Sequence, residues 1–150
     1  MKPPVQLQFL SPIHKASRQV TLYLEHATME LGVSPAEGHL LSYLRSYAPC
    51  PVSEMERVFG HKPSTLTSML DRLAERGLLT RQINPSDRRS FNINLTPEGR
   101  KLAGKLRKTL EAFEQRVREQ ISEKQMDGFR AVMQAIAEVT DIKVREREVS

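Results

Sequence analysis

Small hydroxyl groups and cations share one side of the segment between residues 62 and 76. Leucines and a methionine recur there at intervals of three and four, which predicts an amphipathic helix that ends before Gly77. Short hydroxyl side chains allow close approach to a surface, and the free N–H groups of a helix N-terminus attract phosphate. The segment therefore suits insertion into the major groove of double-stranded DNA, although serine and threonine also occur at helix starts as caps. The residues assigned to this contact are Lys62, Ser64, Thr65, Thr67, Ser68 and Arg72.

Asp71 and Arg72 are charged neighbours on this segment with different expected roles. The planar guanidinium group of Arg72 can reach a guanine edge or a phosphate, and such a contact is typically worth about 1–3 kcal/mol. Alternatively, Arg72 pairs with a nearby carboxylate such as Glu75 on a solvated face. A carboxylate cannot favourably face phosphates, so we expect Asp71 to orient an arginine.

A second group of cations lies in the polar segment 84–90, which separates two stretches of alternating apolar residues. The alternation predicts a β-hairpin over residues 79–95, with Arg88 and Arg89 at its tip. An arginine there can enter a narrow minor groove, and Asp87 can hold one of the two arginines in a productive rotamer. A solvated turn is the alternative. The DNA surface is also expected to include Arg81 and Ser86.

The distribution of charge favours a polyanionic partner for the middle of the chain. The net charge is +5, and residues 57–108 contain 12 basic and 4 acidic side chains. Both ends of the chain are close to neutral. This pattern is expected if the middle faces nucleic acid and the ends face protein.

The pattern of elements around these residues predicts a winged helix-turn-helix over residues 34–95. A capping box beginning at Ser34 opens a helix to about Ser46, and a second box beginning at Ser53 opens a short helix that ends at Gly60. A tight turn, the amphipathic helix and the hairpin follow. The hairpin is then a wing, and the fold class is mainly α with a small β-hairpin, α+β overall.

Residues 8–32 and 97–142 are predicted to form a helical dimerisation part, so that residues 1–150 make a single domain. Apolar residues recur there at helical spacing, in more surface than the small winged part can cover. A two-fold homodimer buries that surface, and an intramolecular helical hairpin is the alternative. On the long helix after Thr96 this apolar face is made of Leu102, Leu106, Leu110, Phe113, Val117 and Ile121.

Several other classes of protein are disfavoured. The chain has no Gly-rich phosphate loop, no Gly-x-Ser-x-Gly motif and no metal-ligand spacing, which argues against an enzyme, a metal site or a cofactor. Its single cysteine, Cys50, lies in a Pro-rich loop and is either an exposed thiol sensor or inert. The lack of a signal peptide or a long apolar run predicts a cytoplasmic protein without membrane contact. A winged domain that binds only protein or RNA remains the alternative function.

Three motifs in this order resemble the MarR family of transcriptional regulators. They are residues 64–81 (STLTSMLDRLAERGLLTR), residues 87–90 (DRRS) and residues 94–99 (NLTPEG). The resemblance implies a homodimer, built from the first and the last two helices, with one winged domain in each subunit. It also implies that the Asp-Arg-Arg loop is the wing tip and that Asp71 pairs with Arg89 to set the angle of the wing.

Members of this family commonly repress nearby genes and release DNA when a small phenolic or other anionic effector, or an oxidant, alters the dimer. The resemblance thus implies an effector site between the dimerisation part and the winged part. The oxidant-sensing branch uses a cysteine in the first helix, and this chain has none there. The residues expected to line such a cleft are His14, Arg18, His39 and Tyr43.

Overall fold

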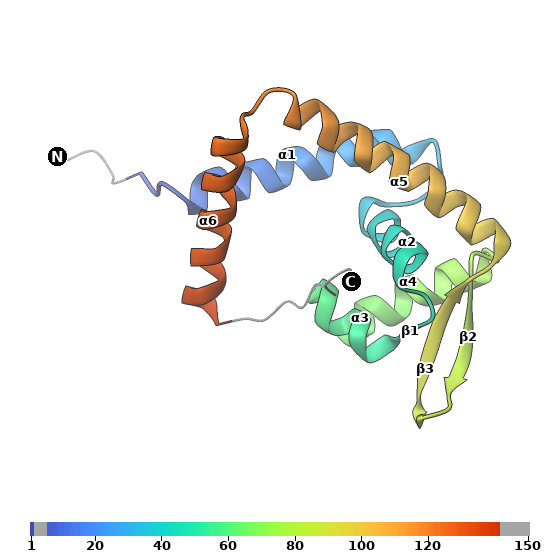
Figure 1. The fold of residues 1–150 in the computed structure, drawn as a ribbon. Helices are drawn as coiled ribbons and strands as arrows, with labels where there is room; N and C mark the ends of the chain where they lie inside the picture. Colours follow the sequence, from blue (N-terminus) through green and yellow to red (C-terminus); the bar gives the residue numbers. More distant parts are fainter. Residues whose placement is uncertain (2–5, 142–150) are drawn as a thin grey trace.

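The computed structural model describes residue 1 and residues 6–141, which form six helices and a three-stranded antiparallel sheet (Figure 1). The predicted α+β fold class is therefore confirmed. In chain order the elements are α1 (Leu10–Met29), α2 (Pro35–Tyr47), β1 (Cys50–Pro51), α3 (Val52–Phe59), α4 (Pro63–Glu75), β2 (Leu79–Asn84), β3 (Asp87–Leu95), α5 (Pro97–Arg118) and α6 (Glu123–Thr140).

Local caps start several of the helices where the sequence predicts them. At α2 the hydroxyl of Ser34 accepts the N–H of Glu37, and the carboxylate of Glu37 accepts the N–H of Ser34, both at 3.2 Å. Ser122 and Gln125 make the same reciprocal pair at α6. Each box satisfies two N–H groups that would otherwise lack a partner.

The predicted capping box at Ser53 is wrong. Helix α3 begins one residue earlier, at Val52, and its N-cap is Pro51, which makes no side-chain cap. Ser53 already lies inside the first turn of the helix, so its backbone is helical and cannot take the extended N-cap conformation. The chain passes directly from β1 into α3, because the extended residue Pro51 is both the last residue of β1 and the N-cap of α3.

The hydrophobic core lies between α2, α4, the sheet and the first half of α5. Leu106 of α5, which the sequence pattern groups with the dimerisation face, is only 1% exposed and belongs to this core. The apolar face of α5 is therefore divided between an inner end and an outer end. The largest fully buried side chains are Leu40, Leu41, Leu44, Met55, Leu66, Leu70, Leu73, Ile93 and Leu106.

The sheet contains a strand, β1, that the sequence did not indicate. It has two residues and pairs with β3, Cys50 opposite Ile93, in the strand order β1-β3-β2. Two prolines around Cys50 argued for a loop, but a proline is tolerated at the edge of a sheet. The side chain of Cys50 is fully buried, so an exposed thiol at this position is wrong.

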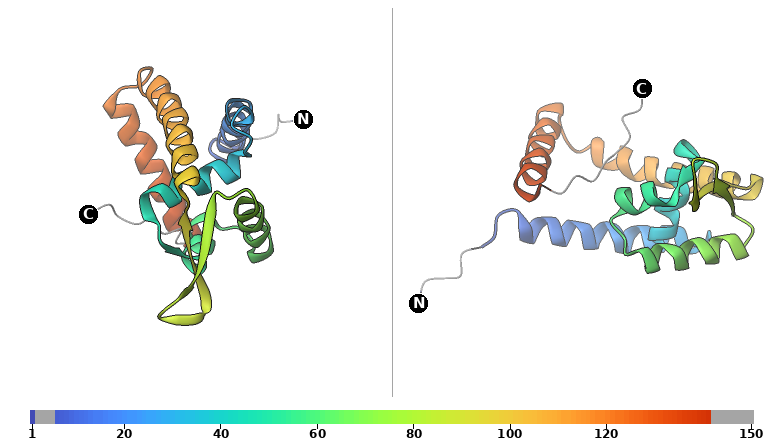
Figure 2. Two further views of the ribbon diagram at one scale, coloured as in Figure 1. Left: turned by 90° about the vertical axis from the view of Figure 1, so that its right-hand side faces the viewer. Right: turned by 90° about the horizontal axis from the view of Figure 1, so that it is seen from below.

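The hairpin spans residues 79–95 as predicted, but its strands are longer and its loop is shorter than the sequence indicates. Strands β2 and β3 extend until only Pro85 and Ser86 connect them, so Arg88 and Arg89 lie on the first residues of β3. At this end only Asn84 and Asp87 pair, because the register shifts between Ile83 and Asn84. Polar residues that face solvent on both sides give no apolar alternation, so the sequence pattern does not reveal the longer strands. The hairpin projects beyond the helices (Figures 1 and 2).

Helices α1 and α6 expose much of their apolar surface. Within the described residues no side chain of α6 is buried, and Phe129 and Val139 are 53% and 88% exposed. Leu10 and Leu22 of α1 are exposed as well. Helix α6 turns back from the far end of α5, away from the sheet (Figures 1 and 2). These faces lack partners within the described chain, as the sequence argument for a second copy expects.

Replacing Gly99 by alanine should strongly destabilise the fold. A Cβ at this position would lie 1.9 Å from the backbone oxygen of Leu78, and neither backbone can move freely there. We expect a loss of about 3 kcal/mol in the free energy of unfolding, at the upper end of overpacking costs. Urea denaturation at one fixed protein concentration measures it.

Gly104→Ala is the matched control on the same helix. Its Cβ would meet only the Arg45 side chain, at 3.8 Å, an ordinary contact. Alanine is the better helix former, so this variant should gain up to about 1 kcal/mol. Equal stability of the two variants would contradict the packing of α5 on Leu78.

Candidate nucleic-acid interface

The N-terminal half of α4 presents free hydroxyl groups to solvent. Helix α4 follows α3 after a turn at Gly60, whose backbone is left-handed, and its N-cap is Lys62, which makes no side-chain cap. The two interpretations of the hydroxyl residues are thereby distinguished, because none of them occupies the capping position. Among the described residues, the following are exposed and have side-chain hydroxyls without an intramolecular hydrogen bond: Ser64, Thr65, Thr67 and Ser68.

Arg72 pairs with Glu37, which neither interpretation of the sequence included. Its Nε lies 3.1 Å from Oε1 of Glu37 on α2, and Glu75, the predicted alternative partner, makes no ion pair within the described residues. The pair joins residues 35 positions apart. Sequence reasoning identified Glu37 as a capping residue, and no local pattern shows that its second oxygen meets α4.

Asp71 pairs with Arg81 of β2 and not with Arg89. Nη2 of Arg81 lies 2.6 Å from Oδ1 of Asp71. Asp71 thus pairs with an arginine, but the partner implied by the family resemblance, Arg89, is wrong. Arg81 lies at the base of the wing beside α4, whereas Arg89 lies near its tip. The ion pair therefore connects the wing to α4 at the base of the hairpin.

The wing tip carries two arginine side chains that make no hydrogen bond or ion pair within the described residues, those of Arg88 and Arg89. Oδ1 of Asp87 accepts the backbone N–H of Arg89 at 3.0 Å. Asp87 thus shapes the backbone of the turn, and the expectation that it holds an arginine rotamer is wrong. The backbone N–H of Ser86 donates to Oδ1 of Asn84 at 3.0 Å, so Ser86 also belongs to the ordered turn.

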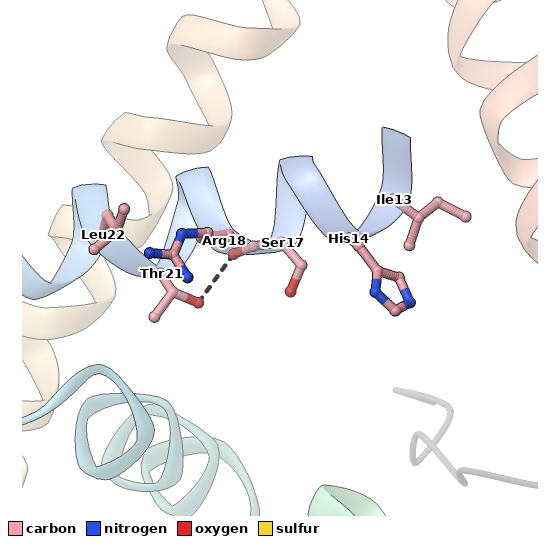
Figure 3. Close-up of a pocket in the computed structure, with 6 residues that line it drawn as sticks. All are labelled: Ile13, His14, Ser17, Arg18, Thr21 and Leu22. Carbon is pink, nitrogen blue, oxygen red and sulfur yellow. Dashed lines mark hydrogen bonds between the residues drawn. The ribbon is translucent and has the colours of Figure 1, made fainter. Parts of the chain in front are cut away.

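The four predicted effector residues do not share one cavity among the described residues. His14 and Arg18 line a shallow hollow that is formed by α1 alone (Figure 3). His39 lines a groove of about 1020 Å³ between α1, α2, α3 and α5, whereas Tyr43 lines neither cavity and packs against Phe59. The wall of that groove includes Val20, Leu24, Phe59, Arg107 and Phe113.

Two further classes of site find no support within residues 1 and 6–141. This part of the chain contains no group of three or more His, Cys, Asp or Glu side chains placed to hold a metal ion. None of its helices is both long enough and apolar enough to cross a membrane.

The arrangement agrees with comparisons to known sequences. The family model described as MarR family matches residues 33–91. The HTH-type transcriptional regulator PecS of Dickeya dadantii is 30% identical over 128 residues, which cover 83% of this chain and 76% of PecS. The HTH-type transcriptional repressor MdtR of Bacillus subtilis is 40% identical over 68 residues. That second match spans only 45% of this chain and 44% of MdtR.

Solved structures share the fold at low sequence identity. The Staphylococcus aureus MepR–DNA complex matches with a TM-score of 0.82 at 19% identity, covering 89% of this chain and 99% of MepR. A mutant of Escherichia coli MarR, complexed with operator DNA, matches with a TM-score of 0.75 at 21% identity, covering 84% of this chain and 91% of that one. The family model covers the winged region, and PecS is 30% identical over most of the chain, so the chain belongs to the MarR family.

Proposed function

We propose that this protein is a transcriptional regulator that binds specific sites in double-stranded DNA as a homodimer. The observation that carries the proposal is the row of unpartnered hydroxyls on the first half of α4, beside a hairpin with two unpaired arginines. The relatives MdtR and PecS are named as a transcriptional repressor and a transcriptional regulator. In this proposal the protein is not an enzyme, because regulating transcription by binding DNA needs no catalysed reaction. The protein then works in the cytoplasm, where the DNA is.

The first half of α4 enters the major groove. Its hydroxyl groups approach the base edges closely, and the N-terminal N–H groups with the Lys62 ammonium contact the flanking phosphates. Arg72 and Arg81 belong to the same surface, but their guanidinium groups are engaged by Glu37 and Asp71. They contribute by holding α4 and the wing in place.

Each wing enters the adjacent minor groove. Arg88 and Arg89 supply the positive charge that a narrow minor groove attracts, and Asp87 and Ser86 keep the two-residue turn compact. The ion pair between Asp71 and Arg81 fixes the distance between the two reading elements.

Dimerisation uses the apolar faces of α1 and α6 and the outer end of α5. In this division residues 34–95 read DNA, and residues 8–32 and 97–142 join the subunits, with residue 142 outside the described part. A two-fold axis places two recognition helices about one turn of DNA apart, roughly 34 Å, so the operator is a pseudo-palindrome.

Repression relieved by a small anionic or phenolic effector completes the proposal. The groove lined by His39, Phe59 and Arg107 has apolar side chains in its wall, and it lies between the dimerisation part and the winged part. Arg107 pairs with Glu111 in the same wall, so an anionic effector replaces that carboxylate when it binds. Arg18 and His14 offer further cationic or hydrogen-bonding groups on α1. No cofactor or metal enters this scheme.

Selection from a random duplex library tests DNA binding directly. We expect the protein to enrich a pseudo-palindromic site and to prefer it over a scrambled duplex by about 10³-fold. The affinity should fall by about three orders of magnitude between 50 and 200 mM salt, as for roughly six phosphate contacts. Enrichment of single-stranded RNA, or no enrichment of any duplex at low salt, would favour the alternative protein- or RNA-binding module.

Removing the wing arginines should weaken binding without unfolding the protein. Arg88→Ala with Arg89→Ala removes two exposed cations, so we expect a loss of about 1–3 kcal/mol in binding to the selected duplex. Fluorescence anisotropy measures the change. Arg45→Ala with Lys108→Ala removes equal charge from α2 and α5 and should have little effect. An equal loss in both variants would show that only net charge matters.

A charge on the exposed apolar face of α6 should separate the subunits. Phe129→Glu replaces a 53% exposed phenyl ring on the proposed dimer interface by a carboxylate. Burying that charge between two subunits is costly. We expect a folded monomer by sedimentation and circular dichroism. Lys124→Glu introduces a carboxylate at another exposed position of the same helix and should remain dimeric. A dimeric Phe129→Glu variant would place the interface elsewhere.

A further inference from the structure

Two arginines at the C-terminal end of α4 contact the corner between α1 and α2, residues 30–37: Arg72 lies in the helix, and Arg76 is its C-cap. Arg72 pairs with Glu37 at 3.1 Å, and Nη1 of Arg76 donates to the backbone oxygen of Gly32 at 2.7 Å. The two arginines are four residues apart, so they lie on one side of the helix. Glu37 and Gly32, the two groups that these arginines contact, belong to the corner that connects α1 to the winged part.

Glu37 is placed for this contact and not only for capping. Its side chain is 10% exposed, whereas that of Arg72 is 55% exposed. One carboxylate oxygen accepts the N–H of Ser34 and the other faces Arg72. A buried carboxylate without a cation is costly, so Arg72 is bound from the inner side of the helix.

Gly32 is fitted to Arg76 in the same way. Its backbone is left-handed, with φ of 71°, and a Cβ at this position would lie 3.3 Å from Nη2 of Arg76. The corner therefore turns tightly and leaves room for the guanidinium group. The second contact is independent of Glu37, since it uses a backbone acceptor.

We propose that Arg72 and Arg76, with Glu37 and Gly32, form a clamp that sets the direction of the recognition helix relative to α1. Arg72 and Arg76 are then positioning residues and make no base contact, in place of the DNA contact expected for Arg72. The proposal rests on the proposed function, because the helix is aimed at DNA.

A small change at the clamp would move the first half of α4 by a distance that matters for DNA binding. The clamp lies about 12 Å along the helix axis from the hydroxyl groups, at roughly 1.5 Å per residue. A tilt of about 10° at the clamp would therefore displace the reading end by about 2 Å. Hydrogen bonds to base edges tolerate a few tenths of an ångström, so a loosened clamp costs specific binding first.

Three variants distinguish aiming from direct contact. Glu37→Gln keeps an oxygen for Ser34 and removes the charge that holds Arg72, Arg72→Gln removes the cation, and the third variant combines both. For a clamp, each single change weakens binding to the library-selected duplex about tenfold, leaves binding to scrambled duplex unchanged, and the double variant is no worse. If Arg72 contacts DNA, Glu37→Gln frees it and binding is unchanged or tighter, which overturns the proposal.

A measurement without DNA separates this proposal from the proposed function. Spin labels at Ser68→Cys on α4 and Glu30→Cys at the corner report the direction of the helix, and buried Cys50 is out of reach of the label. Labelled protein is diluted with unlabelled protein so that only distances within one chain are recorded. The clamp predicts a broader or shifted distance distribution in Glu37→Gln, and an unchanged distribution overturns it even if no duplex is ever selected.

Two further variants complete the design. Asp127→Asn breaks the exposed pair with Arg130 on α6, 2.8 Å long, and should change neither the distances nor the DNA affinity. If Glu37→Gln does not fold, Arg76→Gln removes the contact with Gly32 and leaves the buried carboxylate paired. That variant must then show the broadened distances and the loss of specific affinity, and normal values for both would overturn the clamp.

Discussion

The second half of α4 is held from two sides, and the rest of the interface depends on this constraint. On one side Arg76 donates to the oxygen of Gly32. On the other side the hydroxyl of Thr96 donates to the oxygen of Gly77 at 2.6 Å, and its N–H donates to the oxygen of Leu78 at 3.1 Å. The end of α4 is thereby attached to the turn after α1 and to the start of α5, while the hydroxyl residues at the beginning of α4 stay exposed.

The polar and charged residues of α4 fall into two groups: those near the attached end make contacts inside the protein and, within the described part of the chain, those near the other end do not. Asp71 and Arg72, near the fixed end, are used inside the protein, whereas the hydroxyl residues near the free end have no internal partner among the described residues. A recognition surface needs unpaired groups, and a stable helix position needs paired ones. Separating the two along one helix allows the reading residues to vary without loosening the attachment.

Local signals explain why most of the elements, but not their contacts, could be predicted. Capping boxes, helical spacing and Gly stops act within a few residues, so the bounds of α2 and α4 followed from them within one or two residues. The two-residue strand β1 and the Arg72–Glu37 pair join segments far apart in the chain, and only the folded core brings them together. Asp71 was expected to hold an arginine, but choosing between Arg81 and Arg89 required the register of the hairpin.

Helix α5 links the proposed dimer to the reading surface as one continuous element. Its inner end is buried in the winged core through Ala103 and Leu106, and Gly99 lies against the oxygen of Leu78 just after α4. Its outer end exposes Val117 on the proposed interface. A helix of 22 residues is about 33 Å long and bends little, so it moves as a lever. In the proposed dimer, a change in how the two subunits pack, or in what fills the groove beside Phe113, would therefore shift the spacing of the two α4 helices.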